Sequence, residues 1–132
     1  MPRDNVEIVQ GFFEARNRGD LGCLDYIEAD AEFDLSESRS PYHGIYRGHE
    51  QIRKHWETLR EAWAEAEMHP EEPVAVGDHV VVTVRVSARG RSSGVQLQGF
   101  GANVYTLRDG KIVRFKLFQT RAEALKAVGL AD

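Results

Sequence analysis

Two amide side chains, Asn103 and Gln119, lie in the otherwise apolar segment ANVYTLRDGKIVRFKLFQ (residues 102–119). The pattern predicts two strands joined by a short turn, and the length of that turn decides which side chains face inward. A two-residue Asp-Gly turn would mix apolar and charged side chains on one face. A three-residue Arg-Asp-Gly turn would pair Asn103 with Phe115 and would keep that face apolar. We therefore expect the three-residue turn, with both amides facing inward.

Inward amides can serve a ligand or the protein itself. Tyr105 and Leu117 share the predicted inward face with Asn103, so the amides would lie on a mostly apolar wall. An N–H of Asn103 can donate to a carbonyl oxygen or an oxyanion without any change of protonation. Either amide could instead bond backbone groups where Gly99 and Gly101 bend the strand. Two amides on one face favour the lining of a pocket.

Two titratable side chains are candidates for moving a proton. His43 lies in the polar loop 36–48 beside Tyr42 and Tyr46, and loops on a rigid scaffold often carry function. Asp34, at the end of a short predicted strand, is the candidate carboxylate. Together with Asn103, these residues form the predicted catalytic set.

The histidine spacing does not indicate a metal site. His43, His49 and His55 are six residues apart and lack the one-turn spacing that aims two imidazoles at one ion. His55 borders the apolar stripe of a predicted helix, where it could belong to the core or line a pocket. We expect neither a metal nor a cofactor.

Arg16 falls at the centre of the apolar arc of the first predicted helix. A buried cation without a partner is unstable by several kcal/mol. Arg16 could extend past the helix end into solvent. Alternatively it could point into a cavity and pair with Asp34, Glu37 or an anionic ligand group.

The elements that position these residues predict an α+β fold. The capping pair Asp4 and Glu7 begins the first helix and Gly19 ends it. A third helix carries Trp56 and Trp63 on one stripe, as core and pocket wall. Helices come first and an antiparallel meander follows, so the helices should cover one face of the sheet. The predicted helices are 4–18, 21–27, 50–65 and 121–128, and the predicted strands are 31–35, 73–76, 79–89, 95–108 and 111–120.

Composition limits the class of protein. The chain has 132 residues, which suits one domain spanning 1–132. Its net charge of −4 argues against a nucleic-acid partner. One cysteine, Cys23, allows no internal disulfide and fits a reducing compartment. The sequence shows no apolar run of membrane-spanning length, so we expect no membrane partner and a cytoplasmic location.

The second face of the predicted sheet is too apolar to be simply hydrated. Val80, Val82, Val84 and Val86 share the inward face of one strand, so their neighbours face outward. We expect a homodimer through this outer sheet face. Its residues include Gln96, Gln98, Phe100, Val104 and Phe118.

Four motifs give the chain its family resemblance. FFEARNRGDL, GIYRGHEQIRKHW, LRDGKIVRF and TRAEALKAVGL resemble segments of the SnoaL-like and ketosteroid-isomerase-like branch of the nuclear transport factor 2-like superfamily. The resemblance covers nearly the whole chain. It implies a cone in which a strongly curved, mostly antiparallel sheet wraps around three N-terminal helices, with a short C-terminal helix. It also implies a pocket at the open end of the cone and frequent dimerisation through the outer sheet face.

The residues that carry chemistry in that family are largely replaced. In ketosteroid isomerases a first-helix tyrosine donates to the oxyanion, and Phe12 matches it here. The general-base aspartate matches Leu35, and the acid of the oxyanion hole matches Asn103. SnoaL-type cyclases often carry His-Trp-Asp after the late turn, where this chain has the run Phe-Lys-Leu at 115–117.

The sequence therefore predicts a protein that binds a small organic molecule in a mostly apolar pocket. Cofactor-independent isomerisation, cyclisation or dehydration by proton transfer is an alternative function, and so is a dimerisation module without a ligand. The residues expected to contact the ligand are Phe12, Arg16, Tyr42, Tyr46, Trp56, Trp63, Tyr105, Phe115, Leu117 and Gln119.

Overall fold

The computed structural model of the chain describes residues 4–19, 21–38 and 42–130. Helices come first and most strands follow, as the α+β prediction requires. The elements are α1 (Asn5–Asn17), the 3-10 helix η1 (Leu21–Tyr26), β1 (Ile27–Asp34), β2 (Ile45–Arg47), α2 (Gly48–Ala62), β3 (Trp63–Val76), β4 (His79–Gly90), β5 (Gln96–Arg108), β6 (Lys111–Phe118) and α3 (Arg121–Ala127).

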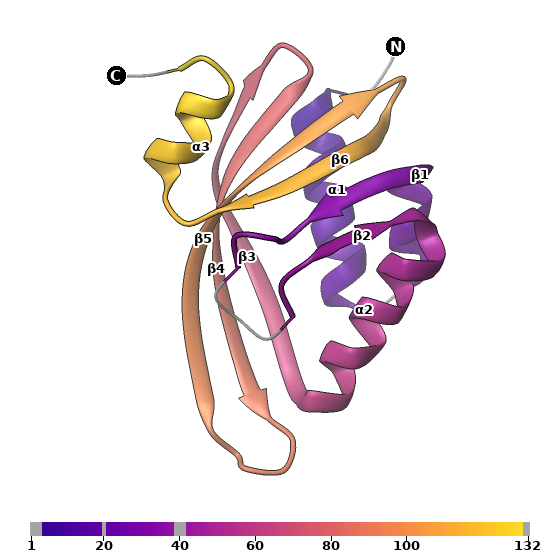
Figure 1. Cartoon of the computed structure of the whole chain (residues 1–132), viewed down its shortest axis with the longest axis vertical. Helices are drawn as coiled ribbons and strands as arrows, with labels where there is room; N and C mark the ends of the chain where they lie inside the picture. Colours follow the sequence, from indigo (N-terminus) through magenta and orange to yellow (C-terminus); the bar gives the residue numbers. More distant parts are fainter. Residues whose placement is uncertain (1–3, 20, 39–41, 131–132) are drawn as a thin grey trace.

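These strands form one strongly curved sheet with the order β2-β1-β6-β5-β4-β3. Neighbouring strands are antiparallel except β1 and β6, which are parallel. The sheet curves around α1 and α2 on its concave side, while α3 lies against the opposite side (Figure 1). The predicted fold class, with its curved sheet and N-terminal helices, is confirmed.

Local signals at both ends explain where α1 forms. The carboxylate of Asp4 accepts a hydrogen bond from the backbone N–H of Val6 at 2.9 Å. Gly19 adopts a φ of 71°, which suits glycine and ends the helix. One side of α1 packs on the sheet, and each large side chain buried there stabilises the fold by about 1.5–3 kcal/mol. These buried residues are Ile8, Val9, Phe12, Phe13 and Ala15.

The boundary between α2 and β3 differs from the predicted one. The sequence predicts a helix up to residue 65 and a strand only from residue 73, but α2 ends at Ala62 and β3 begins at Trp63. Arg91 donates to the carbonyl oxygens of Arg60 and Trp63, and so satisfies acceptors that the helix end leaves open. Pairing along nearly all of β4 then supplies the backbone hydrogen bonds of β3. Trp63 is therefore a strand residue.

The β5–β6 hairpin has the turn that the sequence argument rejected. Arg108 pairs with Lys111 around a two-residue turn, and Asp109 and Gly110 adopt φ values of 52° and 80°. A one-residue bulge at Val113 then shifts the register. Ile112 faces the core in place of Val113, and beyond the bulge Phe115 and Leu117 face inward as predicted, whereas Gln119 does not line the cavity. Tyr105 pairs with Phe115 instead of Val113, and Asn103 pairs with Leu117 instead of Phe115.

Helix α3 covers part of the outer sheet face. The Thr120 hydroxyl accepts from the backbone N–H of Glu123 at 3.1 Å and begins the helix. Ala124 packs with Val81, Ala102 and Val104 in a small second core. Val104 and Phe118, expected at a dimer surface, are thus shielded by their own chain. Phe100 remains 71% exposed.

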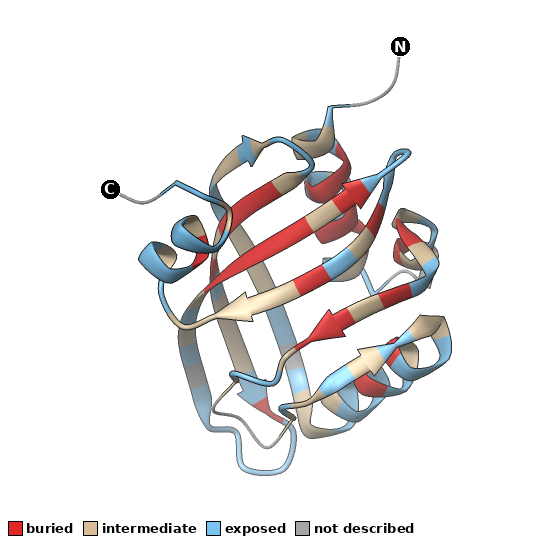
Figure 2. Cartoon of the chain, turned by 45° about the horizontal axis from the view of Figure 1, so that its top comes forward, coloured by how far each residue is buried: buried red, intermediate tan, exposed pale blue. Residues whose placement is uncertain are grey.

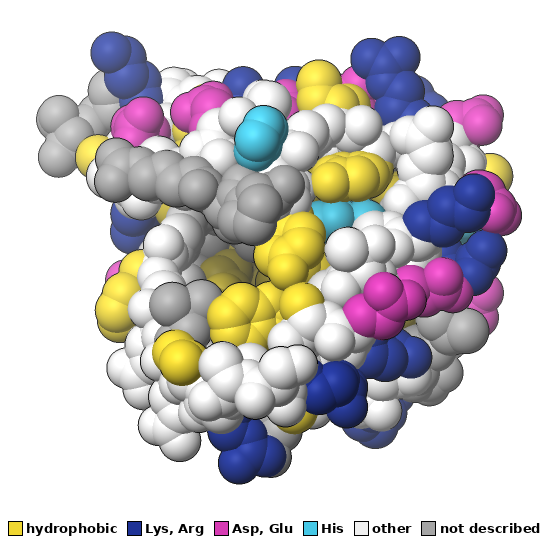
Figure 3. Space-filling view, turned by 60° about the horizontal axis from the view of Figure 1, so that its bottom comes forward, with side chains coloured by type: hydrophobic (Ala, Val, Ile, Leu, Met, Phe, Trp, Pro, Cys, Tyr) yellow, Lys and Arg dark blue, Asp and Glu magenta, His cyan; other side chains and the backbone are white. Residues whose placement is uncertain are grey.

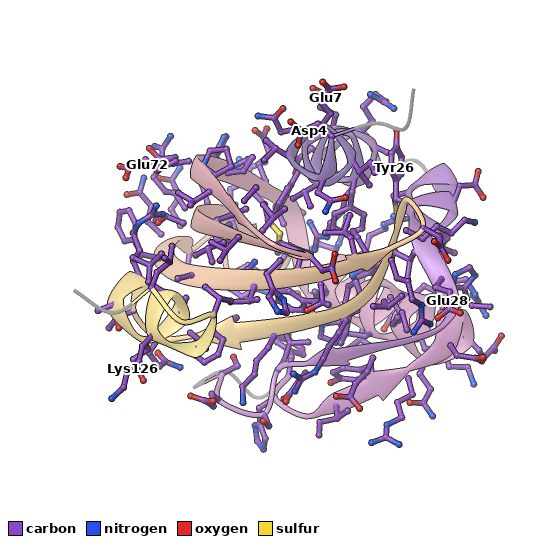
Figure 4. All side chains as sticks on the ribbon, turned by 90° about the horizontal axis from the view of Figure 1, so that it is seen from above. Asp4, Glu7, Tyr26, Glu28, Glu72 and Lys126 are labelled. Carbon is purple, nitrogen blue, oxygen red and sulfur yellow. The ribbon has the colours of Figure 1, made fainter. Side chains whose placement is uncertain are left out.

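Buried residues form a band through the middle strands and the inner surfaces of the helices (Figure 2). Charged side chains surround this core, and the labelled Glu7, Glu28, Glu72 and Lys126 point outward (Figure 4). In residues 4–19, 21–38 and 42–130, no helix is long and apolar enough to cross a membrane.

Candidate ligand-binding site

A cavity of about 340 Å³ lies between the concave sheet face and the helices. Toward the lower end of the molecule in Figure 1, hydrophobic side chains gather around a hollow (Figure 3). The size lies at the lower end of the range for small-molecule pockets. Among the cavity residues are Phe12, Arg16, Phe33, Tyr42, His55, Trp56, Leu59, Trp63, Met68, Val84, Val86, Asn103, Tyr105, Phe115 and Leu117.

Aromatic rings build the inner wall, with Phe12 at their centre. The Phe12 ring centroid lies 6.2 Å from that of Trp56 and 6.0 Å from that of Tyr105. Phe115 lies 5.1 Å from Tyr105 across the β5–β6 pair. Rings at these distances bury large apolar surfaces in tilted or edge-on arrangements. Their arrangement forms a rigid apolar wall that suits a flat organic molecule.

Asn103 and Tyr105 place hydrogen-bond donors on this apolar wall. Both side chains are buried, and the Asn103 amide nitrogen donates to the Tyr105 hydroxyl oxygen at 3.3 Å. The hydroxyl keeps its own hydrogen, and the amide keeps a second N–H. Burial raises the pKa of Tyr105, with an opposing hydrogen bond from Asn103, so the phenol stays protonated. The pair can therefore donate to an oxygen in the cavity.

Arg16 borders the same cavity. Its guanidinium carbon lies 5.9 Å from the centre of a Trp56 ring, within the range of a cation–π contact. Burial lowers the pKa of Arg16, partly offset by Tyr105 and Cys23. In the part of the chain that the structure describes, no carboxylate lies within ion-pair distance of this guanidinium. The neighbours considered from the sequence are engaged elsewhere, because Asp34 and Glu37 both pair with Lys116.

His55 is a neutral imidazole in the cavity wall. It is 7% exposed, and its ring centroid lies 4.2 Å from that of Tyr46. Burial, followed by the positive charge of Arg16, lowers the pKa of His55 to about 4. His55 thus presents an unprotonated nitrogen at neutral pH. The sequence left open whether it was a core or a lining residue, and the structure makes it both buried and cavity-lining.

Asp34 lies on the other side of β1 from the cavity residues Phe33 and Leu35. Its carboxylate accepts from the backbone N–H and the hydroxyl of Ser36, at 3.0 and 2.6 Å. It also lies 3.7 Å from Arg114 and 4.0 Å from Lys116. Burial alone would raise the pKa of Asp34, but the Ser36 hydrogen bonds and the two cations lower it. Asp34 is therefore a buried, ionised carboxylate that pairs with cations closer to the surface.

Three other predicted residues are not in the cavity wall. Gln119 donates to the backbone carbonyl of Glu37 and holds the loop after β1. Tyr46 packs behind His55 and borders a separate surface groove, while its hydroxyl donates to the Tyr42 carbonyl oxygen at 2.8 Å. His43 is exposed. Eight of the predicted contact residues do line the cavity: Phe12, Arg16, Tyr42, Trp56, Trp63, Tyr105, Phe115 and Leu117.

The sequence analysis missed the part of the wall that β3 contributes beyond Trp63. Met68 lines the cavity beside Val86, its partner in the β3–β4 pair. The usable signal was the alternation of Ala66 and Met68 with Glu65 and Glu67, which has the period of a strand. Among the described residues, no group of three His, Cys, Asp or Glu side chains could hold a metal ion.

The cone-shaped sheet with its internal cavity is the architecture of NTF2-like proteins, and a family model assigns the chain more closely. The SnoaL-like domain model matches residues 9–115, and the chain belongs to this family. A comparison with curated proteins finds no match.

Solved structures agree on the fold. An NTF2-like protein from Burkholderia thailandensis E264 has a TM-score of 0.80 at 25% identity, over 95% of this chain and 97% of the other. An NTF2-like protein of unknown function from Burkholderia pseudomallei K96243 has a TM-score of 0.79 at 23% identity, over 95% and 97%. TerC, co-crystallised with polyporic acid, has a TM-score of 0.77 at 20% identity, over 94% and 97%.

Proposed function

We propose that the protein binds a small organic molecule in the cavity, with an oxygen of that molecule accepting hydrogen bonds from Asn103 and Tyr105. The main observation in support is that Asn103 and Tyr105 form a buried pair of hydrogen-bond donors on an otherwise apolar wall. Such a pair orients a ligand, because few other polar groups compete for its oxygen. The proposal is consistent with the complex of TerC with polyporic acid, a relative that is similar in fold.

Binding can be measured with the two tryptophans of the chain. Trp56 and Trp63 are the only tryptophans, and both line the cavity. We expect 4-phenylcyclohexanone to change their fluorescence saturably, and to bind more tightly than phenylcyclohexane, which lacks the oxygen. Absence of saturable binding by the wild-type protein would contradict the proposal.

A cavity-filling variant locates the binding. Val86→Phe places a larger side chain inside the cavity, and we expect the affinity for the ketone to fall at least about tenfold. Val95→Phe makes the same change at a residue that is 59% exposed and outside the cavity, and should leave binding unaltered. Equal affinities of the two variants for the ketone would indicate that the ketone binds outside the cavity.

Proton transfer is a second candidate function, favoured by the neutral imidazole of His55. In this proposal the donor pair polarises a ligand carbonyl, and His55 accepts a proton from the adjacent carbon. His55 takes the part assigned to Asp34 and His43 in the sequence analysis, because it lines the cavity. The test is deuterium incorporation next to the carbonyl of 4-phenylcyclohexanone, followed by NMR. His55→Gln should abolish an exchange that His43→Gln retains.

A further inference from the structure

Arg16 lies at the boundary between the inner cavity and a second pocket. The outer pocket has a volume of about 410 Å³ and lies where the ends of α1 and α2 meet the start of β3. Arg16, Trp56, Leu59 and Trp63 border both spaces. A molecule in the inner cavity therefore has one end within reach of Arg16 and of the outer pocket.

The outer pocket is strongly basic. Besides Arg16, the described residues that border it include Arg18, Arg60 and Arg91 and one acidic residue, Glu67. The carboxylate of Glu67 lies 3.6 Å from the His69 imidazole. This local excess of arginine is opposite in sign to the net charge of −4 of the chain. Their charge attracts an anion to this opening.

The guanidinium of Arg16 has no acidic partner among the described residues, and an anionic ligand would supply one. It contacts the face of Trp56 but no described carboxylate, and the nearby charge of Arg60 repels it. Arg16 is half-buried, which makes its charge costly, since no carboxylate among the described residues compensates the lost hydration. The planar fork of a guanidinium matches the two oxygens of a carboxylate. The inner space beside Arg16 is apolar, so the anion should carry an apolar body.

We propose that Arg16, assisted by the charge of Arg60, binds the carboxylate of the ligand whose apolar body occupies the inner cavity. The ligands are then apolar monocarboxylic acids, with one end at Arg16 and any second oxygen toward Asn103 and Tyr105. This inference rests on the proposed binding function and names the class of ligand.

A matched pair of ligands tests the charge. Naphthalene-2-carboxylate and naphthalene-2-carboxamide have nearly the same shape, and calorimetry at neutral pH measures both. We expect the wild-type protein to bind the carboxylate at least about tenfold more tightly, as charge-assisted hydrogen bonds are stronger than neutral ones. Arg16→Gln should remove this preference, because the carboxylate loses its charged partner while the carboxamide has no charge to lose.

Two controls separate Arg16 from general charge and from misfolding. Arg85→Gln removes an exposed arginine that borders neither pocket, and should keep the preference. Arg60→Gln changes an exposed residue and should weaken carboxylate binding several-fold. This variant tests the same site if Arg16→Gln does not fold. Circular dichroism and thermal unfolding establish the fold of each variant.

The outcomes distinguish this inference from the proposed function. Equal binding of both naphthalenes by the wild-type protein, or an unchanged preference in Arg16→Gln, would overturn the carboxylate site alone. Binding of 4-phenylcyclohexanone without binding of the carboxylate would also overturn it and leave the proposed function standing. If none of these ligands bound, both would be overturned.

Discussion

The amide nitrogen of Asn103 donates to the hydroxyl of Tyr105 at 3.3 Å, between two side chains on the same face of β5. Strand geometry places residues two apart on one face, so this bond forms along the strand. It is buried among aromatic rings and yet borders the cavity. A buried polar pair of this kind costs stability unless its remaining donors are satisfied, and a ligand oxygen can satisfy them.

Removing the Tyr105 hydroxyl should weaken ligand binding more than it weakens the fold. In Tyr105→Phe the ring remains, and the free energy of unfolding should fall by about 1 kcal/mol for the lost hydrogen bond. The affinity for 4-phenylcyclohexanone should fall several-fold, while phenylcyclohexane binds unchanged, as measured by tryptophan fluorescence. Tyr26→Phe is the matched control, because Tyr26 does not line the cavity. An equal loss for both ligands would contradict the assigned role.

The inward face of the β5–β6 hairpin was predictable in large part, although its register was not. Alternation along each strand puts Asn103 and Tyr105 on one face whatever they pair with. The bulge at Val113 is what lets a two-residue turn coexist with an apolar face, and a period of two gives no sign of it. Beyond the bulge, the prediction therefore placed Phe115 and Leu117 on the correct face of the sheet but paired them with the wrong residues of β5.

The start of β3 was mispredicted because two periodicities compete there. The stripe of Ile52, Trp56 and Leu59 continues to Trp63 at helical spacing, and the Ala and Glu residues that follow favour a helix. Tertiary pairing with β4 decides the outcome, which a local pattern does not contain. For the same reason the β3 residues after Trp63 were missing from the predicted site.

Protonation of His55 should make stability depend on pH in a definite window. The folded-state pKa is about 4, below the ordinary 6.5, so the unfolded state binds this proton first. The free energy of unfolding should therefore fall as the pH drops from about 6.5 to about 4, by at most about 1.4 kcal/mol per pH unit. Urea unfolding at several pH values measures this slope. His55→Gln should flatten it and the exposed His43→Gln should not, whereas equal slopes in all three proteins would contradict the prediction.

Asp34 should act on stability and not on binding. Its pKa is lowered, so the ionised form stabilises the fold above the ordinary value of 3.8, and this contribution is lost as the pH falls through the folded-state value. Asp34→Asn should lower the free energy of unfolding at neutral pH by about 1–2 kcal/mol, because the Ser36 hydrogen bonds lose their charge and the cations lose a partner. Ketone affinity should stay within about twofold, since the carboxylate lies outside the cavity.

The exposed Asp30→Asn on the same strand is the matched control and should alter neither property. Loss of ketone binding in a folded Asp34→Asn protein would contradict this prediction and indicate that Asp34 belongs to the binding site.

The uncovered part of the outer sheet face should mediate a homodimer. Helix α3 shields Val104, which leaves Phe100 as the large apolar side chain on β5 that faces outward, 71% exposed. In a two-fold interface Phe100→Lys would place two like charges near each other and remove an aromatic contact. Sedimentation velocity should show a dimer for the wild-type protein and a monomer for this variant. Ile45→Lys changes another exposed apolar residue, on the edge strand β2 three strands away from β5, and this variant should remain dimeric. A wild-type monomer, or dissociation by both substitutions, would contradict an interface at Phe100.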